Sequence, residues 1–522
     1  MPSLLSYPGV YIEEVPSGVR TLTGVATSIT AFVGAAISGD VDEPVMCNSW
    51  ADFARRYGGL SADLPLGYAV KDFFLNGGSQ ALIVRVAPSD ATSATIELPG
   101  TGSPGDLVLE AVSPGDWGNR LRAAVELVEG STTQFNVLVQ YQPRPDGEEV
   151  VTERYLNLTV DPQDTRFVTR ALANESSYVN VKHAPGVRPL ASVGVGSPPS
   201  TQIDWQQGHG GFDGTALVDG DVEGSRDSKT GIFALLKADI FNLLCIPPKR
   251  RGEATSASVY QTALPFCVER RAMLIVDPDP AWGASADAAV SRAIDGRASF
   301  ELSGNDARNA AFYFPCVDQV DPLRDGQIDT FVPCGIVAGI MARTDTARGV
   351  WKAPAGLDAA LNGVQGLQVN LNDLENGRLN LLGINCLRSF PVNGRVVWGA
   401  RTMRGADQQA DEYKYVPVRR LALFIEESLY RGTQWVVFEP NDEPLWGQIR
   451  LNVGAFMQGL FRQGAFQGKS PREAYFVKCD AETTTQNDIN QGVVNILVAF
   501  APLKPAEFVV IRIQQLAGQV QA

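Results

Sequence analysis

The sequence predicts a multidomain α/β protein of mixed α/β and α+β character. A chain of 522 residues is too long for one hydrophobic core, and 44% hydrophobic with 20% charged residues is typical of globular domains. Short apolar runs alternate with segments of helical spacing along most of the chain, which favours α/β layers. Residues 91–205 differ, because Thr, Ser, Pro and Gly become frequent there and short alternating runs predict a mostly β insertion.

The first part of the chain reads as a small α/β segment. The runs at 28–36 and 81–86 predict buried strands, and the spacing of apolar residues predicts helices over 49–57 and 66–75. In the insertion we expect strands at 135–141 and 155–160 and a helix near 164–173.

A Gly/Asp-rich link over 206–231 precedes the middle α/β layer. The strands expected there are 240–246, 272–276 and 311–316, and the expected helices are 256–270 and 332–342.

The last hundred residues have the clearest pattern. Apolar positions fall on one face of a helix over 416–431, where Glu427 can pair with Arg431 one turn later. A strand at 435–438 follows, and then a helix from Asn441 to Gly464 with a broad apolar stripe. Two further strands are expected at 474–478 and 493–500.

Both ends of the chain read as strands with no partner beside them. The runs follow Pro8-Gly9 near the N-terminus and Pro505 near the C-terminus. Their apolar members are Val10, Tyr11, Ile12, Val15, Phe508, Val509, Val510, Ile511 and Ile513. An apolar strand left open is an aggregation hazard unless another strand pairs with it, so we expect these ends to pair between subunits.

Charge and composition exclude several functions. With 44 basic against 58 acidic residues the net charge is −14, which argues against a broad nucleic-acid-binding face. The longest apolar stretches are too short to span a bilayer, and the N-terminus lacks signal-peptide features. We therefore expect a soluble protein made in a cytosol, with no membrane insertion and with its seven cysteines reduced in the core.

The search for catalytic chemistry finds no usable constellation. The two histidines, His183 and His209, lie in Pro/Gly-rich loops and read as solvated side chains. Residues 219–230 imitate the first half of a calcium loop but carry Thr230 where a bidentate Glu is needed, so an acidic surface turn is expected. Carboxylate pairs such as Asp277/Asp279 are common at strand ends. We expect no catalytic, cofactor or metal site.

Several blocks of the sequence, in order, resemble the sheath proteins of contractile phage tails and related injection machines. The resemblance covers residues 5–90 and about 208–516. The blocks are 7–15, 24–34, 73–78, 84–86, 210–214, 241–248, 342–345, 349–355, 419–428, 434–442, 476–480 and 504–508.

The resemblance implies a structural subunit that stacks in rings as a helical tube around an inner tube. Terminal arms of neighbours would add strands to a sheet of the inner domain, and contraction would drive the tube through a target envelope. The implied partners are other copies, the inner tube protein, and baseplate and tail-terminator proteins. Assembly is expected in the cytoplasm of the producing bacterium.

The expected domains follow from the resemblance and from the composition shifts. They are an N-terminal arm (1–22), the first part of the α/β core (23–90), an outward-facing β-rich insertion (91–205), a middle α/β domain (206–400), a C-terminal inner domain (401–505) and a C-terminal arm (506–522).

The resemblance also places a helix of the C-terminal domain against the inner tube. The candidate is 442–463, with Gln448, Arg450, Asn452 and Arg462 off its apolar stripe; the alternative is that this helix is wholly core. Two other functions stay open, a soluble α/β hydrolase-type enzyme and another tail or baseplate component. The sequence does not distinguish a phage tail from a bacteriocin or an extracellular injection system.

Overall fold

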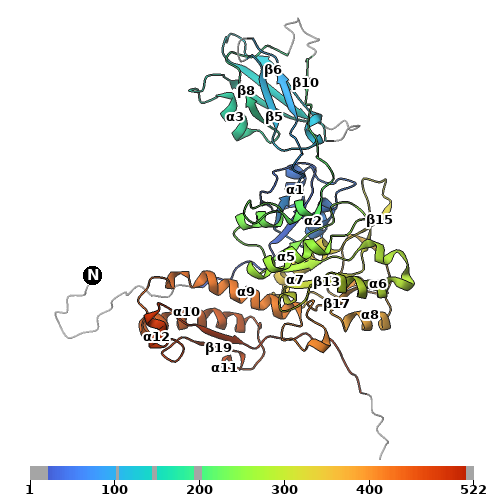
Figure 1. Ribbon diagram of the computed structural model, residues 1–522, viewed down its shortest axis with the longest axis vertical. Coiled ribbons are helices and arrows are strands. Elements are labelled where there is room, and N and C mark those ends of the chain that lie inside the picture. Colours follow the sequence, from blue (N-terminus) through green and yellow to red (C-terminus); the bar gives the residue numbers. More distant parts are fainter. Residues whose placement is uncertain (1–21, 102–104, 144–149, 193–202, 513–522) are drawn as a thin grey trace, which may run out of the picture. The chain divides into compact units, whose positions relative to one another are not determined.

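The computed structural model describes residues 22–101, 105–143, 150–192 and 203–512. Its chain divides into two compact units (Figure 1). The large unit comprises Ser28–Thr344 and Pro354–Lys414, and the other, which we call the C-terminal module, comprises Met1–Thr27, Asp345–Ala353 and Tyr415–Ala522. Each is described by itself below.

An eight-stranded sheet forms the centre of the large unit. Its strand order is β18-β17-β13-β12-β11-β1-β3-β2, in which the strands from β17 through β3 run parallel and the two edge strands run antiparallel to their neighbours. The strands are β1 (Thr30–Gly34), β2 (Val45–Cys47), β3 (Ala81–Arg85), β11 (Leu243–Cys245), β12 (Met273–Val276), β13 (Ala310–Phe314), β17 (Ile384–Phe390) and β18 (Gly394–Val397). The central strands are fully buried and continuously apolar because parallel strands are covered on both faces.

Helices connect and cover these strands (Figure 1). They are α1 (Trp50–Tyr57), α2 (Pro65–Leu75), α4 (Asp219–Glu223), α5 (Ala257–Glu269), α6 (Ala286–Ser299), α7 (Cys334–Arg348) and α8 (Asp373–Asn380). Helix α1 begins where the Ser49 side chain accepts the Asp52 N–H and ends at Gly58, whose φ of 82° suits glycine. A small antiparallel sheet of β14 (Val317–Val320), β15 (Ile328–Phe331) and β16 (Val364–Leu367) is attached.

Residues 95–207 of the large unit are mainly β structure. One sheet has the order β10-β6-β7-β8 and a second has the order β4-β5-β9, with helix α3 (Val168–Glu175). The strands are β4 (Thr95–Leu98), β5 (Leu107–Ala111), β6 (Leu121–Leu127), β7 (Phe135–Tyr141), β8 (Val151–Leu158), β9 (Val179–His183) and β10 (Gln206–Gln207). The buried guanidinium of Arg85 donates to the carbonyl oxygens of Ala36, Gly39 and Pro114, which ties this part to the central sheet.

The C-terminal module is built from two long helices and a hairpin. Helix α9 (Val416–Gly432) begins with Pro417, and helix α10 (Glu443–Arg462) is followed by Gly464 with φ of 81°. The short helix α11 (Pro471–Ala474) precedes β19 (Tyr475–Lys478). A second short helix, α12 (Gln486–Asn490), lies between β19 and β20 (Leu497–Phe500) in the chain. Glu427 and Arg431 form the ion pair predicted from their spacing, at 2.7 Å.

The expected strand at 435–438 is wrong. Residues 435–438 do not form a strand, because the chain makes a 3-10 turn at Gln434–Val436 and Phe438 has φ of +70°. A run of high β propensity forms a strand only where another strand pairs with it. The Gly/Asp-rich link over 206–231 holds β10 and α4.

The cysteines, the two histidines and the acidic turn are the candidates for chemistry in the sequence. All seven cysteines are buried and free, as expected. His209 bridges to Thr95, whereas His183 ends strand β9 rather than lying in a loop, and both histidines are exposed. The expected acidic turn is helix α4, in which Asp219 pairs with Lys249 at 2.5 Å and Asp221 accepts the Val218 N–H.

Burial raises the pKa of Asp277 to about 7, and this carboxylate accepts the Cys334 N–H at the start of α7. In the described ranges no three His, Cys, Asp or Glu side chains are grouped so that they could hold a metal ion. None of the described helices is long and apolar enough to cross a membrane.

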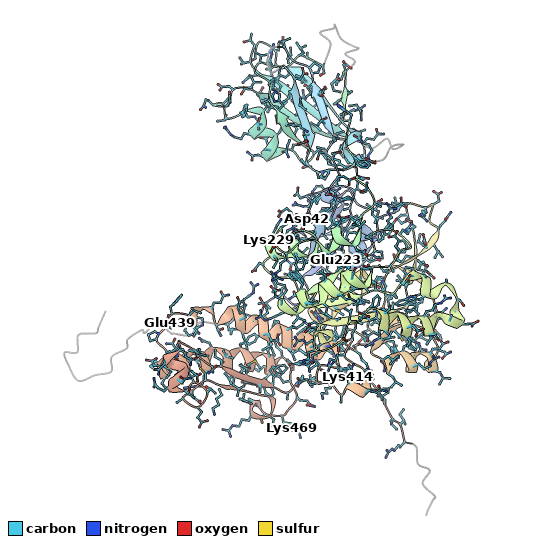
Figure 2. All side chains as sticks on the ribbon, viewed as in Figure 1. Asp42, Glu223, Lys229, Lys414, Glu439 and Lys469 are labelled. Carbon is cyan, nitrogen blue, oxygen red and sulfur yellow. The ribbon has the colours of Figure 1, made fainter. Side chains whose placement is uncertain are left out.

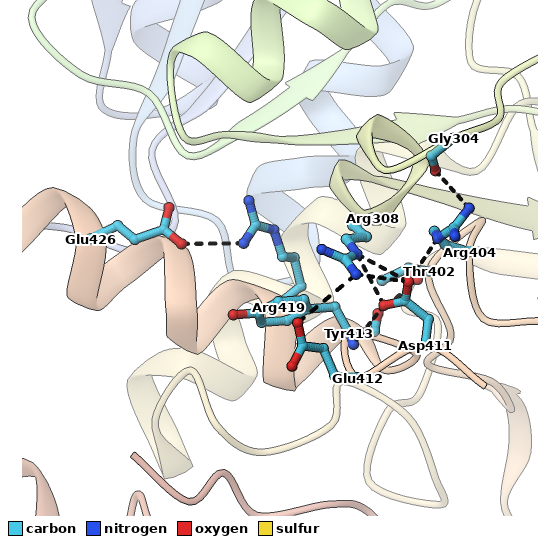
Figure 3. Close-up of polar contacts among 9 residues, drawn as sticks. All are labelled: Gly304, Arg308, Thr402, Arg404, Asp411, Glu412, Tyr413, Arg419 and Glu426. Carbon is cyan, nitrogen blue, oxygen red and sulfur yellow. Dashed lines mark hydrogen bonds and ion pairs between the residues drawn. The ribbon is translucent and has the colours of Figure 1, made fainter. Parts of the chain in front are cut away.

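A buried carboxylate fixes the last loop of the large unit (Figure 3). Asp411 is almost fully covered and accepts hydrogen bonds from Nε of Arg308 at 3.0 and 3.1 Å and from Nε of Arg404 at 2.7 Å. Burial alone would raise the pKa of Asp411, but the bonds from Arg308, the Tyr413 N–H and Arg404 outweigh it and hold the pKa below its usual value. These residues therefore stabilise the loop and are not a site for a ligand.

Candidate assembly module

The C-terminal module has one hydrophobic core. Leu421 and Ile425 of α9 contact it from one side, and α10 contributes Ile449, Val453 and Met457. Phe424 of α9 lies 6.0 Å from Phe456 of α10, ring to ring. The predicted apolar stripe of α10 is therefore the inner face of the module.

The segment that precedes Ser28 lies along α9. The Leu22 side chain packs so closely on Gly432 that a Cβ there would meet its Cγ at 2.3 Å. The Val25 N–H donates to Ser428 Oγ at 3.2 Å, and Arg420 donates to the Thr27 carbonyl at 2.9 Å. The segment thus runs antiparallel to α9, and Leu22 lies at the C-terminal end of that helix.

A buried ion pair fastens the same region. Arg420 donates to the two oxygens of Asp345 at 2.9 and 2.7 Å, and both side chains are less than 5% exposed. Because the guanidinium also holds Thr27, one side chain joins α9, the end of α7 and the N-terminal segment.

The hairpin of the module is a sheet of only two strands. In β19 and β20, Tyr475 pairs with Phe500 and Val477 with Val498, and these four side chains pack on the core. The alternate positions face away from the core and include Phe476 and Leu497, each 50% exposed. No third strand lies beside β19 or β20 in the described residues. Its outer edges carry backbone groups that can pair with a further strand.

The C-terminal segment leaves the hairpin without secondary structure. Residues 503–512 have no assigned element, and Phe508, Val509, Val510 and Ile511 are 71–82% exposed. Tyr415, just before α9, donates its hydroxyl to Glu507 at 3.1 Å. Four adjacent apolar side chains of strand-forming type are therefore presented to solvent next to a sheet that has open edges.

The other predicted arm residues, Val10, Tyr11, Ile12, Val15 and Ile513, lie outside the described residues.

The four residues suggested to face an inner tube differ in their surroundings. Gln448 and Arg462 are exposed on α10. Arg450 donates to the Cys479 carbonyl and pairs with Glu443 at 2.5 Å, so it is held against the module. Asn452 is only 3% exposed and has no hydrogen-bond partner for either amide atom, so the expectation of an accessible side chain is wrong there.

Known proteins similar to this chain are sheath proteins of phage tails. The model of the phage tail sheath C-terminal domain matches residues 408–515. The tail sheath protein of Enterobacteria phage T4 is 22% identical over 503 residues, covering 89% of this chain and 72% of that protein. The chain is thus similar to a contractile tail sheath protein over most of its length.

Two further comparisons show the same similarity to sheath proteins. The tail sheath protein of Vibrio phage KVP40 is 28% identical over 174 residues, which is 33% of this chain but spans only 24% of the length of that relative. The sheath of an extracellular contractile injection system, solved in its contracted state, has the same fold with a TM-score of 0.58 at 21% identity, covering 98% of both chains. Both are sheath proteins by name, and the short blocks of residues in this sequence carry the same resemblance.

Proposed function

We propose that this chain is the structural, non-enzymatic subunit of a contractile sheath that polymerises helically around an inner tube. The observation that supports it is that the C-terminal module carries both an exposed apolar C-terminal segment and, among the described residues, a sheet of only two strands with open edges. An enzyme does not need either feature. The hydrolase alternative has no site of its own among the described residues to support it.

The mechanism is β-augmentation between copies. A strand from one copy adds to the hairpin of another, where backbone hydrogen bonds provide affinity and alternate side chains fix the register. With Val509 and Ile511 on one face and Phe508 and Val510 on the other, half of the added side chains extend the core layer of the recipient. Burying the two side chains on that face is worth roughly 3–6 kcal/mol before the costs of association are subtracted.

The N-terminal run at 10–15 provides a second such strand in this proposal. Because the donor segment and the recipient hairpin are different surfaces, the contact is heterologous and can continue from copy to copy into an open helix. Contraction is then a rigid-body change between two packings that keeps the strand pairing intact. The residues of α10 offered to the inner tube are Gln448 and Arg462, which are exposed.

The remaining partners follow from the family. In this proposal the sheath ends on baseplate and tail-terminator proteins, assembly takes place in the bacterial cytoplasm, and the product is a virion tail or a released injection particle. The expected domain boundaries stay as predicted, with residues 91–205 as the outward-facing insertion.

Negative-stain microscopy of the purified full-length chain tests the proposal. We expect hollow cylinders from the unaltered chain, and we expect none after deletion of residues 1–18 or after Val510→Asp, while the folded core remains. The matched control is Val392→Asp, since Val392 is equally exposed but belongs to the large unit. The proposal would be contradicted if both variants still formed cylinders, or if the unaltered chain stayed monomeric.

A further inference from the structure

One aromatic side chain of the C-terminal module is entirely exposed. Phe438 has 103% of the reference exposure of a Phe, and its neighbour Val437 has 61%. The backbone of Phe438 lies in the left-handed region, with φ of +70°. That conformation is unfavourable for a bulky residue, whereas Gly or Asn adopts it at little cost. Neither exposure nor backbone geometry is explained by the fold of the module itself.

The loop that carries Phe438 is held firmly at its base. Asn441 accepts a hydrogen bond from Trp446 Nε1 at 2.9 Å and donates to the Val493 carbonyl at 2.9 Å. On the other side of the tip, Trp435 and Val436 pack on the core of the module. The Glu439 N–H closes the turn onto the Val436 carbonyl at 3.1 Å. The ring is therefore presented by a preorganised turn, which reduces the entropy lost when a partner covers it.

The position of the loop connects it with the segments proposed to join copies. Phe438 lies six residues after Gly432, the residue on which Leu22 packs, so the N-terminal segment enters the module at the same end of α9. Figure 2 labels Glu439, the next residue, at that end of the module. Through Asn441 the loop also adjoins Val493, which is exposed and leads into β20.

The charge of the module suits contact between identical copies. Its segments contain thirteen basic and thirteen acidic residues, so the whole net charge of −14 belongs to the large unit. Two modules can therefore approach without net repulsion, and the same chain offers exposed apolar surface at Phe476, Leu497 and the C-terminal segment.

We propose that Phe438, with Val437, is the anchor of a contact between the C-terminal modules of two copies of this chain. The inference rests on the proposed function, in which copies are joined by the C-terminal segment and by the N-terminal run at 10–15, a little before Leu22 in the sequence. Rigid aromatic side chains that enter a pocket are the usual centres of protein interfaces. The strained backbone is then retained because it aims the ring at the neighbour.

The test compares assembly with monomer stability in Phe438→Asn. Asparagine tolerates the left-handed backbone, so the temperature of unfolding, measured below the critical concentration of assembly, should be equal to or higher than that of the unaltered chain. The critical concentration, measured by sedimentation of cylinders, should rise at least tenfold. Phe438→Leu keeps an apolar side chain and should lie between the two. Val392→Asn in the large unit is the matched control and should change neither quantity.

Each outcome decides the proposal. Unaltered assembly by Phe438→Asn overturns it while leaving the proposed function in place. Normal cylinders that no longer enclose the purified inner tube protein also overturn it, because the ring would then serve the tube. A lower unfolding temperature in parallel with lost assembly would show a role in the fold of the module. Failure of the unaltered chain to assemble would remove the proposed function and this inference together.

Discussion

Replacing Asp345 by Asn should loosen the C-terminal module more than any surface change. The variant leaves the Arg420 guanidinium buried without its counter-charge, although Thr27 still accepts one hydrogen bond. Removing one partner of a buried, bidentate pair costs about 3–5 kcal/mol, whereas an exposed pair contributes about 0–1 kcal/mol. Since about 1.4 kcal/mol is a factor of ten, local opening of α9 should become at least a hundred times more frequent.

Hydrogen exchange followed by mass spectrometry suits this measurement, because a chain with two units does not unfold as a single two-state system. Peptides from 416–432 should lose protection, while peptides from β12 and β13 of the large unit should not. The control is Arg419→Met, the adjacent residue, whose bond to Glu426 is a single 3.2 Å contact to a partly exposed carboxylate (Figure 3).

The double variant Asp345→Asn with Arg420→Met removes both charges and should recover part of the loss, since no unpaired charge remains. The reasoning fails if Asp345→Asn exchanges no faster than Arg419→Met, or if the double variant is as unstable as the sum of the two single variants.

Three further predictions concern buried polar groups. Burial raises the pKa of Asp72 to about 7 although Gln319 donates to it at 2.8 Å, so the folded chain binds this proton more tightly than the unfolded chain. Its contribution to stability is therefore full below about pH 4 and is lost as the pH rises towards 7, and Asp72→Asn should unfold at a higher temperature than the unaltered chain at pH 8 but not at pH 4. Asp411 has a lowered pKa, so Asp411→Asn should destabilise the large unit in urea at pH 7, and its disadvantage should shrink as the pH falls below about 4. Asn452→Leu removes two buried amide atoms that lack partners and should stabilise the C-terminal module by about 1–2 kcal/mol in hydrogen exchange, whereas Gln448→Leu on the exposed face should change it by less than about 0.5 kcal/mol. A destabilised Asn452→Leu variant would show that the amide is satisfied by water.

Local sequence pattern predicted most of the elements because their formation depends on nearby residues. The alternation over 135–141 coincides with β7, and the apolar stripe of 441–464 coincides with α10. The run at 435–438 failed because strand formation depends on a partner from elsewhere, and the chain provides none there.

Residues joined across long sequence separations were not predictable from the pattern. Arg420 and Asp345 are 75 residues apart, and nothing local indicates that they meet. The position of Asn452 off the apolar stripe of α10 predicts an exposed side chain, but this residue is buried. Phe438 gave no signal as a surface group, since an aromatic residue is expected to be inside. Among the described residues no strand lies beside Phe508–Ile511, which have no assigned element themselves, and their pairing between copies stays a prediction.

Helix α9 has a consequence for the spacing of the two chain ends. Leu22 is attached at Gly432, the last residue of the helix, whereas Glu507 is attached at Tyr415, just before the first. Seventeen residues at about 1.5 Å per residue separate these points by roughly 25 Å. The length of α9 thus sets the distance between the two points where the chain ends are attached. A one-turn insertion would move the attachment points apart by about 5.4 Å while leaving each strand-forming sequence intact, and would change the lattice spacing that the two arms can bridge.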